Sequence, residues 1–279
     1  MKNTLYKCPV CNQSLEKAEK TYHCSNNHTY DISKNGYVNL LLANQKKSIN
    51  PGDSKEMLLH RKDLLNAGYY KNLSDLITKI TKEFIDKNKL ETVSILDMGC
   101  GEGYYLANLI TNLDADYDFY GMDVSKEAIT LAAKRNCNAE FSVANAYTLP
   151  FMDNSFSVIY SVFSPIDENE VLKTLKSNSI IIVIGPGTRH LFDLVKLIYD
   201  EPRLHDYENK LNKSVNFKLL EEHKLNYFVD LQTQEDIKNL FMMTPYFWQV
   251  SPEKREKILG FDSLKMEVDF DIKVFIKFI

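Results

Sequence analysis

The chain has few cysteines and no hydrophobic run long enough to cross a membrane. Its 279 residues include five cysteines, an odd number without a disulfide-like pattern, which predicts reduced thiols and a cytoplasmic protein. No apolar run approaches the roughly 20 residues of a membrane helix, and the lysine-bearing N-terminus has no apolar signal core behind it. No internal repeat is visible. These absences exclude an integral membrane protein and a disulfide-stapled secreted domain.

Charge is distributed unevenly along the chain. Residues 1–90 carry 15 Lys and Arg against 9 Asp and Glu, whereas the rest carries 19 against 29. A basic first third joined to an acidic remainder favours contact with a polyanion such as a nucleic acid. Lysines that only solvate a small domain would give the same balance, so charge alone leaves both interpretations open.

Three cysteines and a histidine near the N-terminus have the spacing of a zinc knuckle. The motif C-x2-C-x12-C-x3-H consists of Cys8, Cys11, Cys24 and His28. These four residues complete a tetrahedral shell, which predicts one structural Zn²⁺ with no open position for catalysis. His23 is the weaker alternative as fourth ligand, because it adjoins Cys24. We expect residues 1–50 to form this module, whose few apolar residues could not fold without a metal.

A glycine-rich loop follows an apolar strand between Val93 and Tyr105. The glycines stand at every second position, and the loop consists of Asp97, Gly99, Gly101 and Gly103 with their neighbours. Glycine frees the backbone to turn tightly and to approach a ligand. A dinucleotide-binding G-x-G-x-x-G loop would need glycine at position 104, where this chain has tyrosine. The G-x-G-x-G form resembles the S-adenosylmethionine loop of Rossmann-like methyltransferases.

Strand and helix patterns alternate from Val93 onward, which predicts an α/β domain with a parallel sheet over residues 93–279. Strands are expected at 93–98, 117–122, 138–143, 157–162 and 179–184, and helices at 103–113, 125–135, 167–176 and 188–200. A strand at 225–231, a helical segment at 232–260 and a last strand at 265–278 complete the domain with an antiparallel hairpin. Residues 51–92 form a helical linker, with a helix from Ser54 to Gly68.

Polar residues follow several of the predicted strands, at the edge where such sheets bind ligands. Asp123 ends the second strand, 20 residues after Gly103, where a carboxylate can accept both hydroxyls of a ribose. Asn145 follows the third strand, where its amide could meet an adenine edge or could serve only as a turn residue. Arg189 and His190 open the helix after the fifth strand, at the rim of the cleft.

The acceptor is expected beside Ser164-Pro165-Ile166, which follows the fourth strand. Asp167 and Glu168 are the nearest acids, but we favour a role for them in capping the next helix, so no catalytic residue is assigned. Four aromatic side chains are candidates for stacking on an acceptor base: Tyr104, Phe163, Phe247 and Trp248.

Seven segments of the chain match, in order, those of a known family. Besides the zinc knuckle they are Gly36-Tyr-Val-Asn-Leu-Leu41, Pro51-Gly-Asp-Ser-Lys-Glu-Met57, Leu65-Asn-Ala-Gly-Tyr-Tyr70, Leu96-Asp-Met-Gly-Cys-Gly-Glu-Gly-Tyr-Tyr105, Gly121-Met-Asp-Val-Ser125 and Gly185-Pro-Gly-Thr-Arg-His-Leu191. Over nearly its whole length the chain resembles the bacterial 23S rRNA (guanine-N1)-methyltransferases. It departs from familiar members after the fourth strand, where Ser164-Pro165 replaces Ala-Pro.

The resemblance implies an enzyme that transfers a methyl group from S-adenosylmethionine to N1 of a guanine in a 23S rRNA hairpin. It also implies zinc on the four knuckle residues, an RNA-gripping role for the zinc module, and a homodimer. The donor-binding residues that it implies are Tyr70, the Gly99–Gly103 loop with Glu102, Asp123 and His190.

Two subtypes of this family methylate neighbouring guanines, and in one of them the modification contributes to resistance against macrolides such as tylosin. The motifs do not separate the subtypes. One competing interpretation is a methyltransferase of a small molecule or a protein, with a purely structural zinc module. Another is a binding protein that has lost the chemistry, against which the intact glycines and Asp123 argue.

Overall fold

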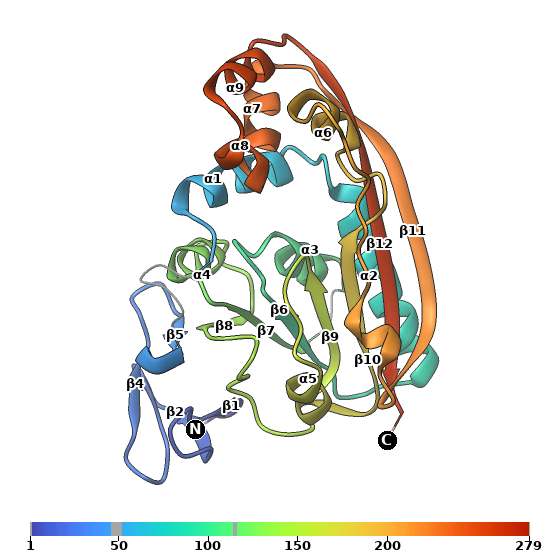
Figure 1. Ribbon diagram of the computed structural model, residues 1–279. Coiled ribbons are helices and arrows are strands. Elements are labelled where there is room, and N and C mark those ends of the chain that lie inside the picture. The colour runs from blue at the N-terminus through green and yellow to red at the C-terminus, as the bar shows by residue number, and fades with distance from the viewer. Residues whose placement is uncertain (1, 46–51, 114–115, 279) are drawn as a thin grey trace.

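The computed structural model describes residues 2–45, 52–113 and 116–278. Figure 1 shows a small module of N-terminal strands beside a central sheet, and a helical lobe beyond one edge of that sheet. The predicted boundary between zinc module and linker, at residues 50 and 51, falls outside the described residues and stays a prediction. Within the described part of the chain, no helix combines the length and hydrophobicity needed to span a bilayer.

Eight strands form the central sheet, in the order β11-β12-β10-β9-β6-β7-β8-β5. They are β5 (Val38–Asn39), β6 (Ser94–Met98), β7 (Asp118–Asp123), β8 (Glu140–Val143), β9 (Phe156–Val162), β10 (Leu175–Pro186), β11 (Phe217–Leu231) and β12 (Leu264–Lys277). The strands from β5 to β10 pair in parallel, and β12 is antiparallel to both of its neighbours. This confirms the predicted Rossmann-like methyltransferase sheet with its closing hairpin.

Both faces of the sheet are covered, as the hydrophobic strands of a parallel sheet require. Every residue of β6 is buried, and successive residues of Ile180–Ile184 in β10 alternate between two hydrophobic cores. The first core lies under α2 (Lys71–Asn88), α3 (Tyr104–Leu113) and α4 (Lys126–Ala133). The second core, on the opposite face, lies under α5 (Glu168–Thr174) and the N-terminal module.

The N-terminal module is a four-stranded antiparallel sheet of β1 (Lys2–Lys7), β2 (Ser14–Lys17), β3 (Thr21–His23) and β4 (Thr29–Asp31). It is anchored by Tyr6, whose fully buried ring stacks on Phe151 at 5.1 Å and meets Tyr120 edge-on at 5.4 Å. The Tyr22 hydroxyl donates to Glu140 on β8 at 2.7 Å. The module therefore shares its core with the α/β sheet.

The short strand β5 extends this connection, because it pairs with β8 at the edge of the large sheet. Two residues make the strand, Val38 and Asn39, and the N–H of Leu40 continues the pairing by donating to the Val143 carbonyl at 3.0 Å. Sequence patterns did not predict this strand, since two residues carry no periodicity.

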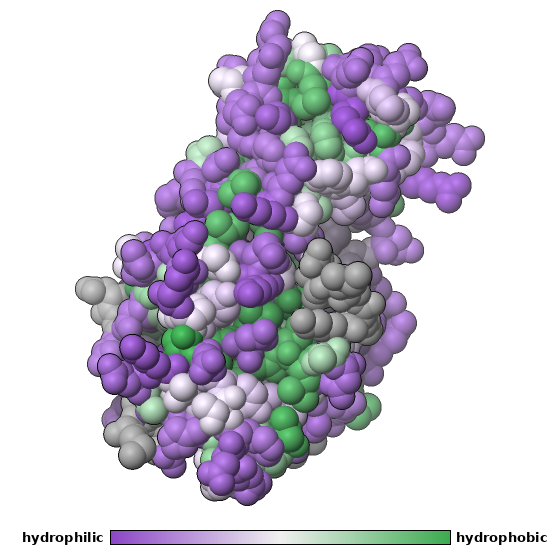
Figure 2. Space-filling view, turned by 90° about the vertical axis from the view of Figure 1, so that its left-hand side faces the viewer, coloured by the Kyte–Doolittle hydropathy of each residue, from purple (hydrophilic) through white to green (hydrophobic). Residues whose placement is uncertain are grey.

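A helical lobe covers the carboxyl edge of the sheet (Figure 1). It consists of α1 (Lys55–Asn66), α6 (Phe192–Ile198), α7 (Gln234–Met242), α8 (Pro245–Gln249) and α9 (Pro252–Leu259). Helix α1 begins after Ser54, whose hydroxyl accepts the Met57 N–H, and is followed by Gly68 at φ +87°, as the sequence predicts. His60 joins α1 to Asn239 of α7 through a 2.6 Å hydrogen bond. Figure 2 shows this lobe standing above the body, with hydrophobic side chains gathered on the body below it.

Replacing Tyr6 with alanine should lower the free energy of unfolding by about 3–5 kcal/mol, the usual cost of deleting a fully buried aromatic ring. Because Tyr6 joins the module to the sheet, the loss should appear in one cooperative transition, measured by chemical denaturation with circular dichroism and fluorescence. Val215→Ala, at a position that is 87% exposed, is the control and should cost less than about 0.5 kcal/mol. An early separate transition for the module would contradict this prediction.

Candidate functional site

The four predicted zinc ligands come together in the N-terminal module. Their ligand atoms all lie within 4.8 Å of one another. His28 Nδ1 is 3.6 Å from the Cys8 sulfur and 3.4 Å from the Cys24 sulfur, and the Cys11 and Cys24 sulfurs are 3.6 Å apart. Bonds of about 2.3 Å to sulfur and 2.0 Å to nitrogen around a tetrahedral zinc give ligand separations of roughly 3.5–3.8 Å. The cluster therefore fits one structural Zn²⁺, and His23 is not part of it.

The environment of Cys8 favours a metal-binding thiolate. Burial raises the pKa of this thiol, but hydrogen bonds from Tyr30 and from the backbone of Cys11 and Val10 lower it to about 6. The Tyr30 hydroxyl lies 3.1 Å from the Cys8 sulfur, where it can donate to a thiolate. Such outer partners orient metal ligands and stabilise their charged form.

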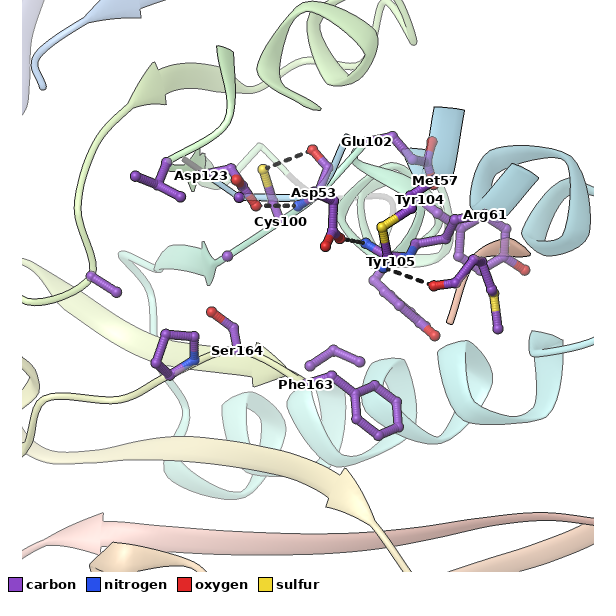
Figure 3. A pocket seen from close by; sticks show the side chains of 18 of the residues that line it. Asp53, Met57, Arg61, Cys100, Glu102, Tyr104, Tyr105, Asp123, Phe163 and Ser164 are labelled. Atoms are coloured by element: carbon purple, nitrogen blue, oxygen red, sulfur yellow. Dashed lines mark hydrogen bonds and ion pairs between the residues drawn. The ribbon is translucent and has the colours of Figure 1, made fainter. Parts of the chain in front are cut away.

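A cavity of about 770 Å³ opens at the carboxyl ends of β6 to β9, below the helical lobe. Its wall includes the glycine-rich loop, the segment 144–147 after β8, and the segment 162–165 at the end of β9. Residues of α1 and of the α7–α8 turn complete it. Figure 3 shows the glycine-rich loop with Arg61 on one side of the open space and Phe163 with Ser164 on the other. The volume is that of a typical small-molecule site.

Gly99 sets the closest approach between two loops of the site. Its φ is +81°, and a Cβ atom at this position would lie 2.0 Å from the Ser164 hydroxyl. Gly101, at φ +56°, also lines the cavity. Gly103 instead faces α4, where its Cβ would lie 2.9 Å from that of Ala132, so it permits helix packing. Of the three glycines, Gly99 and Gly101 thus line the cavity, whereas Gly103 serves the packing of the loop against α4.

Asp123 lines the cavity and is fixed by backbone N–H groups. Its carboxylate accepts from Gly101 at 3.0 Å and from Ser125 at 2.8 Å. Burial raises its pKa, although both N–H groups lower it. Asp97 lies buried behind the loop rather than on the wall, and burial also raises its pKa.

Glu102 reaches the wall with one carboxylate oxygen, Oε2, held by Arg135, while Oε1 is buried and has no hydrogen-bond partner among the described residues. Arg135 donates its Nε to Glu102 Oε2 at 2.8 Å and to the Glu102 carbonyl at 2.9 Å. Burial raises the pKa of Glu102 in spite of this guanidinium. The pair ties the glycine-rich loop to the end of α4.

The turn before α6 differs from its prediction. Helix α6 begins at Phe192, since Leu191 has a left-handed φ of +53° that no α-helix accepts, so the predicted helix over 188–200 is too long. Arg189 and His190 therefore precede the helix instead of opening it. Arg189 turns away to Glu267 at 2.7 Å, whereas His190 lines the cavity. Burial and the neighbouring His205 lower the pKa of His190 to about 3, which keeps its ring neutral.

Tyr70 lies on the same wall, with its ring edge-on to His190 at a centroid distance of 6.3 Å. Its hydroxyl is buried and has no hydrogen-bond partner among the described residues. A buried hydroxyl without a partner is costly, and a polar ligand in the cavity would supply the hydrogen bond that Tyr70 lacks.

Asn145 also lines the cavity, and its side chain makes a turn. The Oδ1 atom accepts the Tyr147 N–H at 2.9 Å, as a turn residue would, and contact of the amide with an adenine edge stays a prediction. Asp167 likewise caps α5, accepting the N–H groups of Asn169 and Glu170 at 3.1 Å, as predicted.

Sequence reasoning missed the contribution of α1 to the cavity. Met57 and Arg61 of α1 line it, as does Asp53 just before the helix, and Arg61 pairs with Asp53 at 2.5 Å. Arg61 is the only Lys or Arg on the wall within the described ranges, and its Nη1 lies 4.0 Å from where a Cβ of Gly101 would stand. The segment Pro51–Met57 is one of the segments that match the family, but nothing in the sequence predicts that it lies beside the glycine-rich loop.

Comparisons with known proteins agree with both sites. The N-terminal domain of RlmA, a zinc ribbon, matches residues 6–49, and a methyltransferase domain matches residues 95–178. YxjB of Bacillus subtilis, provisionally named a 23S rRNA (guanine-N(1)-)-methyltransferase, is 29% identical over 98% of each chain. The 23S rRNA (guanine(748)-N(1))-methyltransferase of Streptomyces fradiae is 26% identical over 95% of each. A Micromonospora griseorubida protein, provisionally named a 23S rRNA (guanine-N(1)-)-methyltransferase, is 31% identical over 68% of each.

The chain belongs to the 23S rRNA (guanine-N1)-methyltransferase family. It is an S-adenosylmethionine-dependent methyltransferase with a structural zinc site. The cavity lies at the carboxyl ends of the parallel strands, where sheets of this kind bind their ligands. The assignment of this cavity, and of single residues on its wall, to the donor is a proposal.

Replacing Cys24 with serine should leave the methyltransferase largely without zinc, because one of four ligands and its thiolate charge are lost. Metal analysis of the dialysed protein measures the ratio of zinc to chain. Cys137→Ser, outside the cluster, should keep one zinc per chain. Full zinc content in the Cys24 variant would remove this residue from the site.

Replacing Gly101 with arginine should abolish donor binding, since the new side chain starts at φ +56° and faces Arg61. Titration with S-adenosylhomocysteine in a calorimeter measures the affinity. Gly36→Arg is the matched control, because φ is +92° there and nothing lies within 4 Å of an added Cβ. Normal affinity in the Gly101 variant would contradict the assignment of the loop.

Proposed function

We propose that this methyltransferase transfers a methyl group from S-adenosylmethionine to N1 of one guanine in a hairpin of 23S rRNA. One observation carries the proposal: the glycine-rich loop and the Ser164-Pro165 loop line a single cavity, in a chain of this family. A donor loop and an acceptor loop that touch are what a direct transfer between two substrates requires.

The wall of the cavity offers groups that fit the parts of the donor. Asp123 would hold the ribose, and the segment Ala144–Tyr147 would hold the adenine. Arg61 supplies a guanidinium for the carboxylate of the methionine part, and the Tyr70 hydroxyl supplies a further hydrogen bond. When bound, the donor supplies a methyl group made electrophilic by its sulfonium.

Guanine N1 carries a proton that has to leave before or during the transfer. Asp167 is occupied as the cap of α5, and Glu168 accepts hydrogen bonds from Ser214 at 2.6 Å and Asn216 at 2.9 Å. Neither acid lines the cavity. The proton of N1 therefore passes to another group or to water.

The N-terminal zinc module is proposed to help hold the RNA hairpin. The basic first third of the chain supplies positive charge for phosphates, and the exposed Lys20 and Lys34 lie in this module. The same proposal includes the homodimer that the resemblance implies and a reaction in the cytoplasm, where ribosomal RNA would be met.

The test supplies wild-type protein with radiolabelled S-adenosylmethionine and deproteinised 23S rRNA from cells that lack the modification. We expect label in the RNA and one new reverse-transcription stop in a hairpin, because a methyl group on N1 blocks base pairing. The position of the stop also decides the subtype. Gly101→Arg is the inactive control. Label that enters a protein or a small molecule, and not RNA, would replace this proposal by the competing one.

A further inference from the structure

Phe163, directly after β9, has a backbone conformation that aromatic residues rarely adopt. Its φ is +53°, in the left-handed region where most other described non-glycine residues are asparagines. A bulky side chain is strained there, and such strain persists only where neighbouring groups fix it. The Phe163 N–H donates to Ile184 at 2.9 Å, and the Ser161 hydroxyl donates to the Ser164 carbonyl at 3.1 Å.

The strained backbone holds the ring on the cavity wall. Phe163 is 47% exposed, although its ring has neighbours in His190, at 5.3 Å, and Phe270, at 6.0 Å. In Figure 3 the ring lies on the same side of the open space as Ser164, across from the glycine-rich loop. An aromatic ring is therefore presented to the cavity beside the loop where the acceptor is expected.

The other three aromatic candidates are placed differently. Tyr104 is buried, with Arg135 at 5.6 Å from its ring, and Phe247 is buried, with Arg255 at 4.4 Å from its ring. Trp248 is exposed but does not line the cavity. Of the four, only Phe163 combines exposure with a place beside the acceptor loop.

We propose that the Phe163 ring is the platform on which the target guanine stacks. This rests on the proposed function and specifies how that function holds its acceptor. Stacking engages the face of a base drawn out of a hairpin and leaves its N1 edge free for the donor. The strain at position 163 keeps the ring in this place before RNA arrives, so less ordering is needed on binding.

The test compares variants of the full-length, zinc-loaded protein on a 23S rRNA hairpin that the wild type methylates. Phe163→Gly removes the ring and also relieves the strain, because glycine accepts φ +53° without cost. We expect kcat/KM for the RNA to fall roughly 10- to 100-fold, while S-adenosylhomocysteine affinity is unchanged and Tm is not lowered. Phe163→Trp should keep most of the activity, and Phe228→Ala, an exposed ring on β11, is the control.

Full kcat/KM in Phe163→Gly would overturn the inference. So would an equal loss of S-adenosylhomocysteine affinity, because the ring would then belong to the donor site. Tyr147 is also an exposed ring on the wall. If kcat/KM for the RNA fell in Tyr147→Ala and not in Phe163→Gly, the guanine would stack on Tyr147, and the inference would also be overturned. If the wild type itself methylates no RNA, the proposed function fails first, which distinguishes the two failures.

Discussion

The contact between the glycine-rich loop and the loop after β9 is the constraint on which the site depends. A side chain at position 99 would overlap the Ser164 hydroxyl, so only glycine lets the two loops close on each other. The Gly99 and Cys100 N–H groups both donate to the Met122 carbonyl, at 2.8 and 2.9 Å, which fixes the loop against β7. The order of the parallel strands thereby brings the glycine-rich loop and the Ser164-Pro165 loop to one cavity.

The zinc module is part of the core that supports this sheet. Cys8 and Cys24 are themselves buried and belong to the same hydrophobic cluster as Tyr6, Phe151 and the second face of β9. Because zinc binding fixes the module, metal affinity contributes to the stability of the whole chain. The module thus covers this face of the sheet in the place where a helix would usually lie.

Much of the fold was readable from local patterns. The strands β6 to β9 and their helices follow hydrophobic runs and caps such as Ser54 and Asp167, and the zinc ligands follow from chemistry at fixed spacing. The features that the sequence did not predict depend on contacts between segments far apart in the chain. Examples are β5 on the large sheet, and the Arg61–Asp53 pair on the cavity wall.

Backbone conformation set a second limit on prediction. The late start of α6, at Phe192 and not at residue 188, and the direction of the Phe163 ring both follow from left-handed φ values at residues whose type gives no such signal. A glycine in a sequence indicates that this conformation is possible, whereas leucine and phenylalanine adopt it only when tertiary hydrogen bonds impose it.

The central claim is that the protein uses this cavity to methylate N1 of a guanine in 23S rRNA, and its most direct test is made in cells. Reverse transcription of 23S rRNA would compare a strain with the intact gene and one whose gene carries Gly101→Arg. The account predicts one hairpin guanine that stops the polymerase in the first strain and is read through in the second. Identical patterns in the two strains would contradict it.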